Sequence, residues 1–437
     1  MRRKLLSFLL AATMVTGCIG LTGCGNKDAA DAGSAAQSSD AGSENAGEDA
    51  VANLIKSTKD TVKLTVWASE EDQDLTKSML DKFQKEYSDV KFNIQLGKES
   101  ESKTKDDILK DVDAAPDVFA FADDQINELV KAGALQEVVA DYTYDVKSEN
   151  VAGSIEAATV DDKLYAYPMT ADNGYFMFYD SSVFSEDDVK TLDGMVAAAK
   201  KAGKKIAIEA SNAWYFYSFF KGAGYELSLN EDGSNTCDWN GDGATDVAQA
   251  IIDLYKSGIV VNLNDAATVT GIKDGTVAAA VNGTWNAKAA SKAWKKNYSA
   301  CKLPTFTVAG KQVQMASFSG CKLVGVNPRS KFVGWSMLLA EYLTNYDAQV
   351  ERFNQRELGP SNIKASESDE VQSNKAIAAL ASQAEFAAPQ RVGNNYWSPV
   401  ETLGKKLADG NPKGTDLQKL LDNAVAGITA SVEDSAK

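Results

Sequence analysis

The stretch that decides the fold is Val62-Lys63-Leu64-Thr65-Val66-Trp67, which alternates apolar and polar side chains as a half-buried strand does. Two further strands are predicted downstream, at 90–95 and at 116–121. A helix is predicted after the first strand from four apolar residues that share one face: Leu75, Met79, Phe83 and Tyr87. Strands that alternate with helices predict an α/β lobe with a largely parallel sheet.

The pattern changes near 167–169, where this first alternation of strands and helices ends. The next segment, at 174–179, is apolar and aromatic, and it predicts a strand that crosses into a second lobe. The second lobe is expected to have its own strand at 205–208 and its own helices, two of them at 214–221 and 247–256. The predicted fold class is therefore α/β with two lobes.

Residues 1–23 have the plan of a secretory signal, with a basic end, an apolar run at 5–15 and small residues before a cysteine. Leu21-Thr22-Gly23-Cys24 resembles the lipobox of bacterial lipoproteins, in which the cysteine is diacylated and becomes the new N-terminus. Cys18 is a second candidate, but the residues that follow it are still apolar, whereas the chain turns polar after Cys24. We therefore predict lipidation at Cys24; a signal peptide with incidental cysteines is the alternative.

The segment at 24–60 consists mainly of Ala, Gly, Ser, Asp and Glu, with no aromatic side chain. A segment of this composition buries too little apolar surface to offset its ordering entropy, so we expect a lipidated disordered linker. Such a linker would hold the folded part on the extracellular face of the bacterial cell membrane.

The chain is strongly acidic, with a formal net charge of −16. Residues 1–23 contain three basic and no acidic side chains, so their removal gives −16 − 3 = −19. This charge argues against nucleic acid and anionic membrane surfaces as partners. Histidine is absent, which excludes Ser-His-Asp and Cys-His catalysis and the common zinc sites. No later run approaches transmembrane length, so the expected membrane attachment is the lipid alone.

Three cysteines follow Cys24, at Cys237, Cys301 and Cys321. In an exported protein, one disulfide and one remaining thiol would be a natural arrangement. Cys301 and Cys321 flank a predicted turn at 309–311 and could pair between adjacent strands, but three free thiols fit the sequence equally well.

Seven short stretches in order along the chain form a recognisable set: Leu64–Trp67, Ala115–Phe119, Ala132–Leu135, Tyr165–Pro168, Ala280–Trp285, Leu303–Phe306 and Tyr396-Trp397. Together they span nearly all of 61–437. The set resembles the maltose and maltodextrin-binding proteins, which are extracellular solute-binding receptors of bacterial ABC importers.

This resemblance implies a periplasmic-binding-protein fold, in which two α/β lobes are joined by hinge strands and close around a ligand in a cleft. The N-terminal lobe would comprise 61–171 and 322–362, and the C-terminal lobe 172–321 and 363–437. Three crossings between the lobes are then expected, close to these boundaries.

The resemblance also implies a function: non-catalytic capture of an oligosaccharide, with maltodextrin as the expected α-glucan, and delivery to the permease subunits of an ABC transporter. A monomer without a cofactor is expected. One alternative keeps the fold and changes the ligand to another glycan or a peptide. The other is a secreted glycoside hydrolase, which needs a carboxylate whose pKa is raised by apolar surroundings, and the sequence indicates none.

Candidate sugar contacts in the N-terminal lobe follow from sugar chemistry, because a pyranose presents an apolar face for an aromatic ring and hydroxyls for carboxylates. Trp67 and Glu71 lie at the carboxyl end of the first strand, where open α/β sheets bind ligands. Asp123 and Asp124 lie in the same way after the third strand. The resemblance assigns an aromatic platform to Phe121 and hydroxyl binding to Asp124; core packing and helix capping are the alternatives.

Candidate contacts in the C-terminal lobe are mostly aromatic. Trp214 and Tyr215 open a helix with four consecutive aromatic residues, which cannot all share one buried face. Trp285 begins a helix directly after the Asn282-Gly283-Thr284 turn, and we expect it to face the cleft.

Four further residues complete the predicted site. Asp172 falls where the resembling family has a hinge-side carboxylate, although a solvated turn residue is the alternative. Near the C-terminus Arg391, Tyr396 and Trp397 surround a polar loop, and Trp397 matches a stacking residue of that family. Two positions depart from the family pattern, since Gln125 replaces a basic residue and Asn212 replaces a glutamate.

A separate motif, at 238–243, fits the first half of a calcium loop through Asp238, Asn240 and Asp242. Its twelfth position is Gln249, which cannot provide a bidentate carboxylate. We therefore predict no metal site, and a polar turn that caps the following helix.

Overall fold

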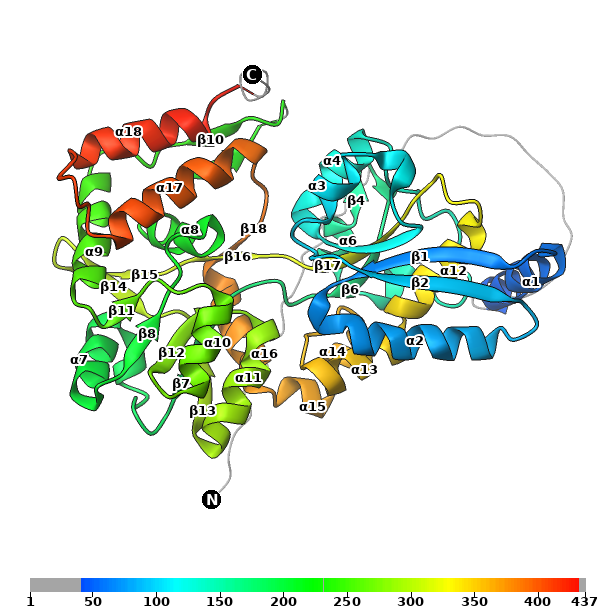
Figure 1. The fold of residues 1–437 in the computed structure, drawn as a ribbon, viewed down its shortest axis with the longest axis horizontal. Helices are drawn as coiled ribbons and strands as arrows, with labels where there is room; N and C mark the ends of the chain where they lie inside the picture. The colour runs from blue at the N-terminus through cyan, green and yellow to red at the C-terminus, as the bar shows by residue number, and fades with distance from the viewer. Residues whose placement is uncertain (1–40, 231, 432–437) are drawn as a thin grey trace, which may run out of the picture. The chain divides into compact units, whose positions relative to one another are not determined.

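The first sheet is built from the predicted strands and has the order β2-β1-β3-β17-β6 (Figure 1). The computed structural model describes residues 41–230 and 232–431, and Gly42 onward belongs to one compact unit. Strand β1 pairs in parallel with β2 and β3, whereas β17 runs antiparallel to β3 and β6. The strand bounds are β1 (Val62–Ala68), β2 (Phe92–Lys98), β3 (Val118–Ala122), β6 (Tyr167–Thr170) and β17 (Lys322–Val326).

Helices pack on this sheet and bury one apolar core with it. Three residues of the predicted helical face, Leu75, Met79 and Phe83, are buried there in α2, which confirms that face. The helix bounds are α2 (Gln73–Glu86), α3 (Thr104–Ile108), α4 (Ile126–Lys131), α5 (Val146–Glu149), α6 (Ala152–Ala157), α12 (Val333–Thr344) and α13 (Tyr346–Arg356). The short hairpin β4 (Thr159–Val160) and β5 (Lys163–Leu164) lies between α6 and β6 in the chain.

The second sheet has the order β11-β8-β12-β7-β13. Its strands are β7 (Phe176–Asp180), β8 (Lys205–Ala207), β11 (Val260–Val261), β12 (Val277–Asn282) and β13 (Tyr298–Cys301). The helices of this part are α7 (Leu192–Ala202), α8 (Ala213–Gly222), α9 (Ala244–Lys256), α10 (Asp265–Lys273), α11 (Thr284–Trp294), α16 (Lys375–Gln383), α17 (Trp397–Ala408) and α18 (Leu417–Ile428). Two sheets with their own helices form the α/β fold with two lobes that the sequence predicted.

The chain passes between the two sheets three times. The first passage joins β6 to β7, and the second joins β16 (Ser317–Ser319), which pairs with β18 (Ala387–Pro389), to β17. The third follows α13 through α14 (Ile363–Ser366) and α15 (Asp369–Gln372) to α16, which packs on β7 and β13. The hairpins β9 (Leu227–Leu229) with β10 (Asn235–Cys237) and β14 (Thr305–Val308) with β15 (Lys311–Gln314) extend the C-terminal part. The exact lobe boundaries, at 171/172, 321/322 and 362/363, remain a prediction.

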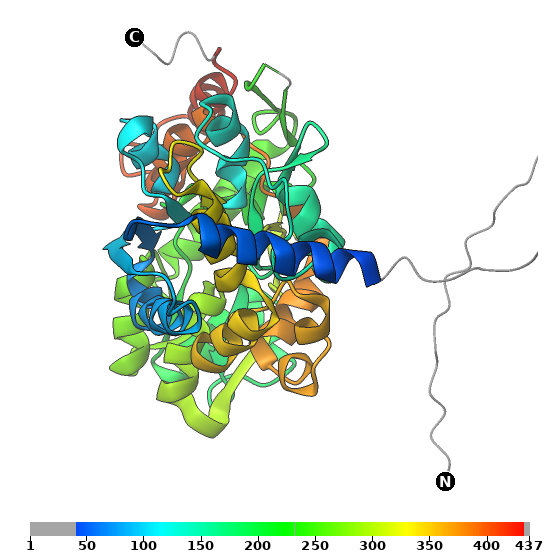
Figure 2. The same cartoon turned by 90° about the vertical axis from the view of Figure 1, so that its right-hand side faces the viewer.

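A helix, α1 (Ala41–Ser57), occupies much of the segment that we expected to be a disordered linker. It is the dark blue helix that faces the viewer in Figure 2. Val51, Leu54 and Ile55 pack against the N-terminal core, and Trp335 Nε1 donates to Thr58 Oγ1 just beyond the helix. The expectation of disorder is wrong for this part of the segment, because it was based on the average composition and did not consider the spacing of these three apolar residues, which lie on one face of a helix. The predicted signal at 1–23, Cys24 and the linker up to 40 lie outside the described residues.

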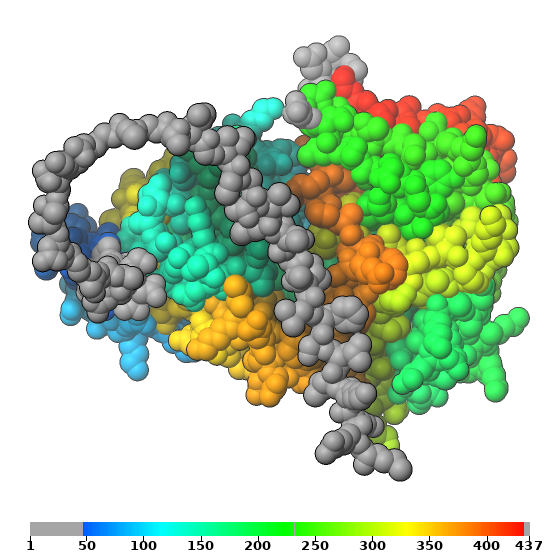
Figure 3. Space-filling view, turned by 180° about the vertical axis from the view of Figure 1, so that it is seen from behind, coloured from blue at the N-terminus to red at the C-terminus, as the bar shows by residue number. Residues whose placement is uncertain are grey.

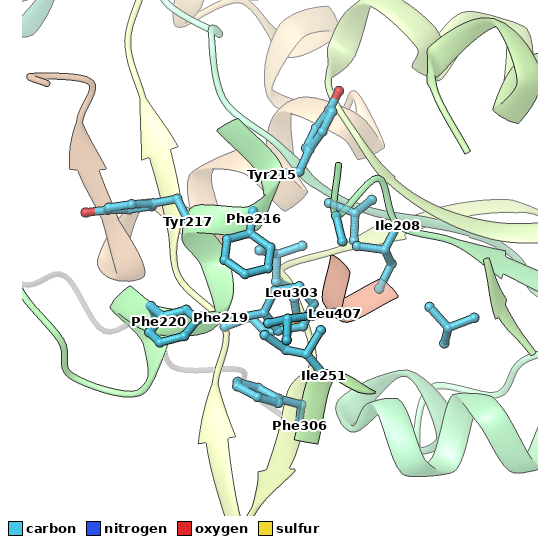
Figure 4. Packing of buried hydrophobic residues seen from close by; sticks show 14 of the residues in the cluster. Ile208, Tyr215, Phe216, Tyr217, Phe219, Phe220, Ile251, Leu303, Phe306 and Leu407 are labelled. Carbon is cyan, nitrogen blue, oxygen red and sulfur yellow. The ribbon is translucent and has the colours of Figure 1, made fainter. Parts of the chain in front are cut away.

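The C-terminal core is rich in aromatic side chains, many of them from α8 (Figure 4). Phe216, Phe219 and Phe220 are fully buried, and Phe220 stacks on Trp239 with ring centroids 4.8 Å apart. Figure 4 shows Tyr215 pointing away from these phenylalanines. The α8 helix is therefore held from several sides, which fixes the direction of the aromatic residues at its start.

The three cysteines of the described part, Cys237, Cys301 and Cys321, are free thiols, so the disulfide alternative is not realised in this structure. Over 41–230 and 232–431, no helix combines the length and the apolarity needed to cross a membrane.

Candidate functional site

Surfaces from the two lobes meet at the carboxyl ends of their strands. Asp123 directly follows β3, and its Oδ2 lies 3.3 Å from Arg391 Nη1 of the C-terminal lobe. Lys322 pairs with Ala122 at the end of β3, and its Nζ lies 5.8 Å from the ring centroid of Trp285, which follows β12. Because open α/β sheets bind ligands at this end, we call the region around Trp67, Asp124, Trp214 and Trp285 the interlobe site.

The C-terminal side of the interlobe site is an aromatic wall. The half-buried rings of Trp214 and Trp285 have centroids 5.6 Å apart and an interplanar angle of 40°. Trp214 Nε1 donates to Gln390 Oε1 at 2.7 Å, and Trp285 Nε1 donates to Asp265 Oδ2 at 3.0 Å. Since both indole N–H groups are held, each ring has a defined orientation, and its partly exposed surface is available for an apolar partner.

Two glycines make room for the proposed stacking rings. A Cβ atom on Gly283 would come within 2.1 Å of the Trp285 ring, and one on Gly97 within 2.7 Å of Trp67 Cδ1. Only glycine allows each ring to lie this close to the backbone. The positions of the Trp285 and Trp67 rings therefore depend on Gly283 and Gly97, which leave the space that the rings occupy.

Carboxylates that we did not predict lie behind the aromatic wall. Asp265 accepts hydrogen bonds from Trp285 Nε1, from Tyr215 OH at 3.2 Å and from Asn282 Nδ2 at 2.6 Å. Burial, reinforced by the charge of Asp265, raises the pKa of Glu209 to about 7. A signal for both was present, because Glu209 and Asp265 each follow closely after a strand, β8 and β11.

The N-terminal side presents Asp124 as an acceptor. Its buried Oδ1 has no hydrogen-bond partner in the part of the chain that the structure describes. Burial, followed by the neighbouring charge of Asp123, raises the pKa of Asp124 to about 7, although Lys105 opposes this. An unpartnered carboxylate oxygen at a strand end is suited to a sugar hydroxyl. The expectation that no carboxylate has a raised pKa was wrong for Asp124 and Glu209.

Within the acidic run 70–72, the structure buries Asp72, whereas the predicted Glu71 is exposed. Asp72 Oδ1 lies 2.9 Å from Arg356 Nη1, and its Oδ2 lies 3.8 Å from Arg352 Nε. The Glu71 carbonyl accepts a hydrogen bond from the same Arg356. Asp72 is therefore the fixed carboxylate of this run, and the exposed Glu71 stays a predicted sugar contact.

Asp123 and Arg391 contact each other across the lobes, so both predicted sugar contacts already have a protein partner. Asp123 is buried, and its Oδ1 also accepts from the Cys321 backbone N–H at 3.2 Å. Burial raises the pKa of Asp123, and Arg391 opposes that shift. The pair joins the two lobes and leaves Asp123 buried, whereas sugar contact by the partly exposed Arg391 stays a prediction.

A second bridge lies beside this pair. Lys105 Nζ donates to Asn394 Oδ1 at 2.8 Å, and Asn394 Nδ2 donates to Glu128 Oε2 at 2.9 Å. Lys105 and Glu128 also form an ion pair at 3.2 Å. These contacts were not predicted, since they join residues far apart in the sequence.

Asp172 lies at the hinge and is almost fully buried. Its Oδ2 accepts from Thr284 Oγ1 at 2.7 Å and from the Gly359 N–H at 2.6 Å. The carboxylate therefore joins the first and third crossings to the start of α11, which corrects the predicted sugar contact. The alternative, a solvated turn residue, is wrong as well because Asp172 is buried.

Three predicted aromatic contacts are buried within their own lobes. Phe121 is fully buried because both faces of β3 are covered, and Tyr396 is fully buried with its OH donating to the Ala213 carbonyl. Tyr215 is also buried and supports the wall from behind through Asp265. The structure therefore contradicts a direct stacking role for these rings. Trp397 keeps part of its surface exposed beside Tyr396 and remains a candidate.

The two departures from the family pattern have structural roles. Gln125 Nε2 donates to the Glu101 carbonyl at 2.6 Å, and its Oε1 accepts from the Lys105 N–H at 2.8 Å. Asn212 caps α8, because its Oδ1 accepts from the Trp214 N–H at 3.0 Å. Both side chains therefore position segments that carry the site.

All three residues of the calcium motif form hydrogen bonds within the protein. Asp238 Oδ1 accepts from the Glu226 N–H, Asn240 Nδ2 donates to Asp422 Oδ1, and the Asp242 carbonyl accepts from Tyr225 OH. Among residues 41–230 and 232–431, no group of three or more His, Cys, Asp or Glu side chains could hold a metal ion.

Comparison with known proteins places this geometry among related folds. The profile of a family described as bacterial extracellular solute-binding protein matches residues 78–379, which is more than half of the chain. A galactooligosaccharide-binding protein of Bacillus subtilis (strain 168) is 28% identical over 97% of this chain and 96% of its own length.

Solved structures give the same picture. A structure described as being with acarbose is 30% identical, with a TM-score of 0.76, over 86% of this chain and 100% of that chain. The maltodextrin-binding protein MalE1 from L. casei BL23, without ligand, is 26% identical, with a TM-score of 0.71, over 85% of this chain and 100% of that chain.

Proposed function

Because the chain belongs to the bacterial extracellular solute-binding protein family, we propose that it captures an oligosaccharide between its lobes and delivers it to the permease of a sugar ABC transporter. The observation that carries this proposal is the aromatic wall of Trp214 and Trp285, together with the Asp124 oxygen at the end of β3 that has no partner among the described residues. Indole faces suit the apolar face of a pyranose, and a carboxylate suits its hydroxyls.

The proposed ligand is a maltodextrin, an α-glucan. Support comes from the 26% identical maltodextrin-binding protein and from the structure described with acarbose. Galactooligosaccharide is the second candidate, favoured by the Bacillus relative that matches almost the whole chain. Trp67, Trp214, Trp285, Trp397 and Asp124 are the proposed contacts.

Calorimetric titration with maltotetraose and with β-galactotriose tests this choice. We expect maltotetraose to bind more tightly by at least about tenfold, a difference of about 1.4 kcal/mol. The reverse order would replace maltodextrin by galactooligosaccharide. No heat with either sugar, followed by binding of xylo- or manno-oligosaccharide, would keep the receptor and change its ligand.

We also propose that the protein acts without catalysis. Asp124 and Glu209 have the raised pKa values that a glycoside hydrolase would use, so the question needs a direct experiment. Incubation with maltotetraose should leave the sugar intact. Release of shorter sugars at catalytic rates, with loss of this activity in Asp124→Asn or Glu209→Gln, would contradict the proposal.

Attachment through a lipid on Cys24 is part of the proposal. Cells expressing the wild type should incorporate labelled fatty acid into the protein, and Cys24→Ala should abolish the label and release the protein. Cys18→Ala is the matched control, since both cysteines follow glycine. Label that survives Cys24→Ala but not Cys18→Ala would move the lipid to Cys18.

A further inference from the structure

Lys322 lies at the point where the second crossing enters the N-terminal lobe, as the first residue of β17 (Figure 1). The Lys322 Nζ atom is 5.8 Å from the ring centroid of Trp285 in the C-terminal lobe and 3.6 Å from Glu101 Oε1 in the N-terminal lobe. Behind the crossings, orange surface of the segment around α16 lies between the teal N-terminal part and the green C-terminal part (Figure 3). Lys322 therefore belongs to the joint between the lobes and contacts both of them.

The ammonium group of Lys322 is held in its charged form. Burial lowers the pKa of Lys322, but nearby carboxylates more than offset this and leave the pKa above its ordinary value. The largest of these contributions comes from Glu101, followed by Asp72 and Asp172. Lys322 is therefore a cation at neutral pH, although only 13% of its side chain is exposed.

The donors of this cation are unused by the described residues. The distance of 3.6 Å to Glu101 Oε1 is too long for a hydrogen bond, and Lys322 Nζ donates to no other described residue. An ammonium group can donate up to three hydrogen bonds, and leaving them unmade in a buried place is costly. Glu101 Oε1 has no accessible surface, whereas Lys322 Nζ retains some. An oxygen of a ligand in the interlobe site can therefore reach Nζ.

We propose that Lys322 is a ligand-binding residue of the interlobe site, whose ammonium group donates a hydrogen bond to an oxygen of the sugar unit that stacks on Trp285. This inference rests on the proposed function and adds a residue to its site. A pyranose stacked on an indole lies about 3.5–4.0 Å from the ring. Its oxygen-bearing rim then comes next to an ammonium group 5.8 Å from the ring centroid. Because Lys322 belongs to the N-terminal lobe and Trp285 to the C-terminal lobe, the bound sugar favours the arrangement in which both reach it.

Calorimetric titration tests the contact with the sugar that the wild type binds most tightly among maltotetraose, β-galactotriose, xylotetraose and mannotetraose. Lys322→Met keeps the length of the side chain and removes its charge and its donors. A double variant, Lys322→Met with Glu101→Gln, also removes the carboxylate that would otherwise stay buried without a cation. We expect both variants to bind the sugar about tenfold or more weakly than the wild type, as loss of a hydrogen bond from a charged donor does.

Lys364→Met is the matched control. Lys364 Nζ also lies over an aromatic ring, 4.5 Å from the centroid of Tyr346, but this lysine is exposed and is not part of the interlobe site. The control should keep wild-type affinity. Unchanged affinity in Lys322→Met would overturn the contact. Weak binding in Lys322→Met that the double variant restores would also overturn it, since the loss would then come from the unpaired charge of Glu101.

The same titrations separate this inference from the proposed function. If the wild type binds one of the four sugars and both Lys322 variants bind it equally well, only the role of Lys322 is overturned. If the wild type binds none of them, the proposed function fails and the inference fails with it. Circular dichroism of each variant shows whether it is folded, and if Lys322→Met does not fold, the double variant decides.

Discussion

The two lobes bury different chemistry. The charged residues in the buried set of the described chain are Asp72, Glu101, Asp123, Asp172, Glu341 and Arg352, which belong to the N-terminal lobe or to its first crossing. The described C-terminal lobe instead buries a continuous aromatic cluster around α8 (Figure 4). The interlobe site has both kinds of group in each lobe, with Trp67 and Asp124 in the N-terminal lobe, and Trp214, Trp285 and the supporting Asp265 in the C-terminal lobe. The comparison indicates that the N-terminal lobe holds buried charges through partners, whereas the C-terminal lobe is held by packed aromatic rings.

The largest expected effect concerns the N-terminal lobe and its stability. Burial raises the pKa of Glu341 to about 7, although Tyr142 and Thr143 donate hydrogen bonds to it. The folded state therefore holds this proton more tightly than the unfolded state does. The free energy of unfolding should fall by about 3 kcal/mol as pH rises from about 4.5 to about 7. Glu341→Gln should remove this contribution to the pH dependence of stability.

Urea denaturation at several pH values across this range measures how the free energy of unfolding depends on pH. Glu156→Gln changes an exposed carboxylate of the same lobe and should leave the slope as it is in the wild type. An identical slope in Glu341→Gln and the wild type would show that the buried carboxylate is not what makes this lobe sensitive to pH.

Trp285→Ala tests the aromatic side of the comparison. The variant should lose roughly 1–3 kcal/mol of oligosaccharide binding, the scale of removing one large contact, without unfolding. Trp285→Phe keeps a ring and should lose less. Calorimetry gives the affinity and circular dichroism the fold; unchanged affinity in a folded Trp285→Ala protein would remove this ring from the site.

Arg391→Ala breaks the contact that joins the two sides. The Arg391 side chain is 33% exposed and that of Asp123 is 2% exposed, so the pair lies between surface and buried ion pairs. We expect sugar binding to weaken by roughly 1–2 kcal/mol, less than for a fully buried pair. Lys405→Ala removes an exposed pair with Asp409 and is the control. Equal affinity of both variants would mean that the Arg391 pair does not support closure.

Asp124→Asn tests the polar side and should have the smallest effect, about 0.5–1.5 kcal/mol. Because the ionised carboxylate is the better acceptor, wild-type affinity should rise as pH increases through about 7, the pKa of Asp124. The variant should lose this rise. Glu209→Gln is needed to tell which lobe carries the titrating group, since the pKa of Glu209 in the C-terminal lobe is also about 7. A pH profile that only Glu209→Gln alters would place the titrating group behind the aromatic wall.

Features that depend on neighbouring residues in the sequence, such as strands and helix starts, were predicted correctly. Strand alternation at 62–67 predicted the first sheet, and the turn at 282–284 placed Trp285 at a helix start, where the structure has it. In the acidic run at 70–72, the short turn decides which residue points inward, and it buries Asp72 and leaves Glu71 exposed, so the predicted sugar contact at Glu71 stays a prediction. Composition alone also missed α1, whose apolar residues need the core before they order the helix.

Contacts between distant segments account for the other errors. The resemblance assigned an aromatic platform to Phe121, and Tyr396 was a predicted contact, but neighbouring elements cover both completely. Asp123 and Arg391 were each predicted separately, and only the folded chain brings them together. Asp265 and Glu209 follow strands, yet their role depends on Trp285 and Tyr215, which come from other elements.

A crystal structure of the protein with maltotetraose would show whether the sugar lies between the lobes. We predict glucose rings stacked on Trp285 and Trp214, with a sugar hydroxyl donating to Asp124 of the N-terminal lobe. A sugar that binds on one lobe only, with both indoles left uncovered, would contradict it.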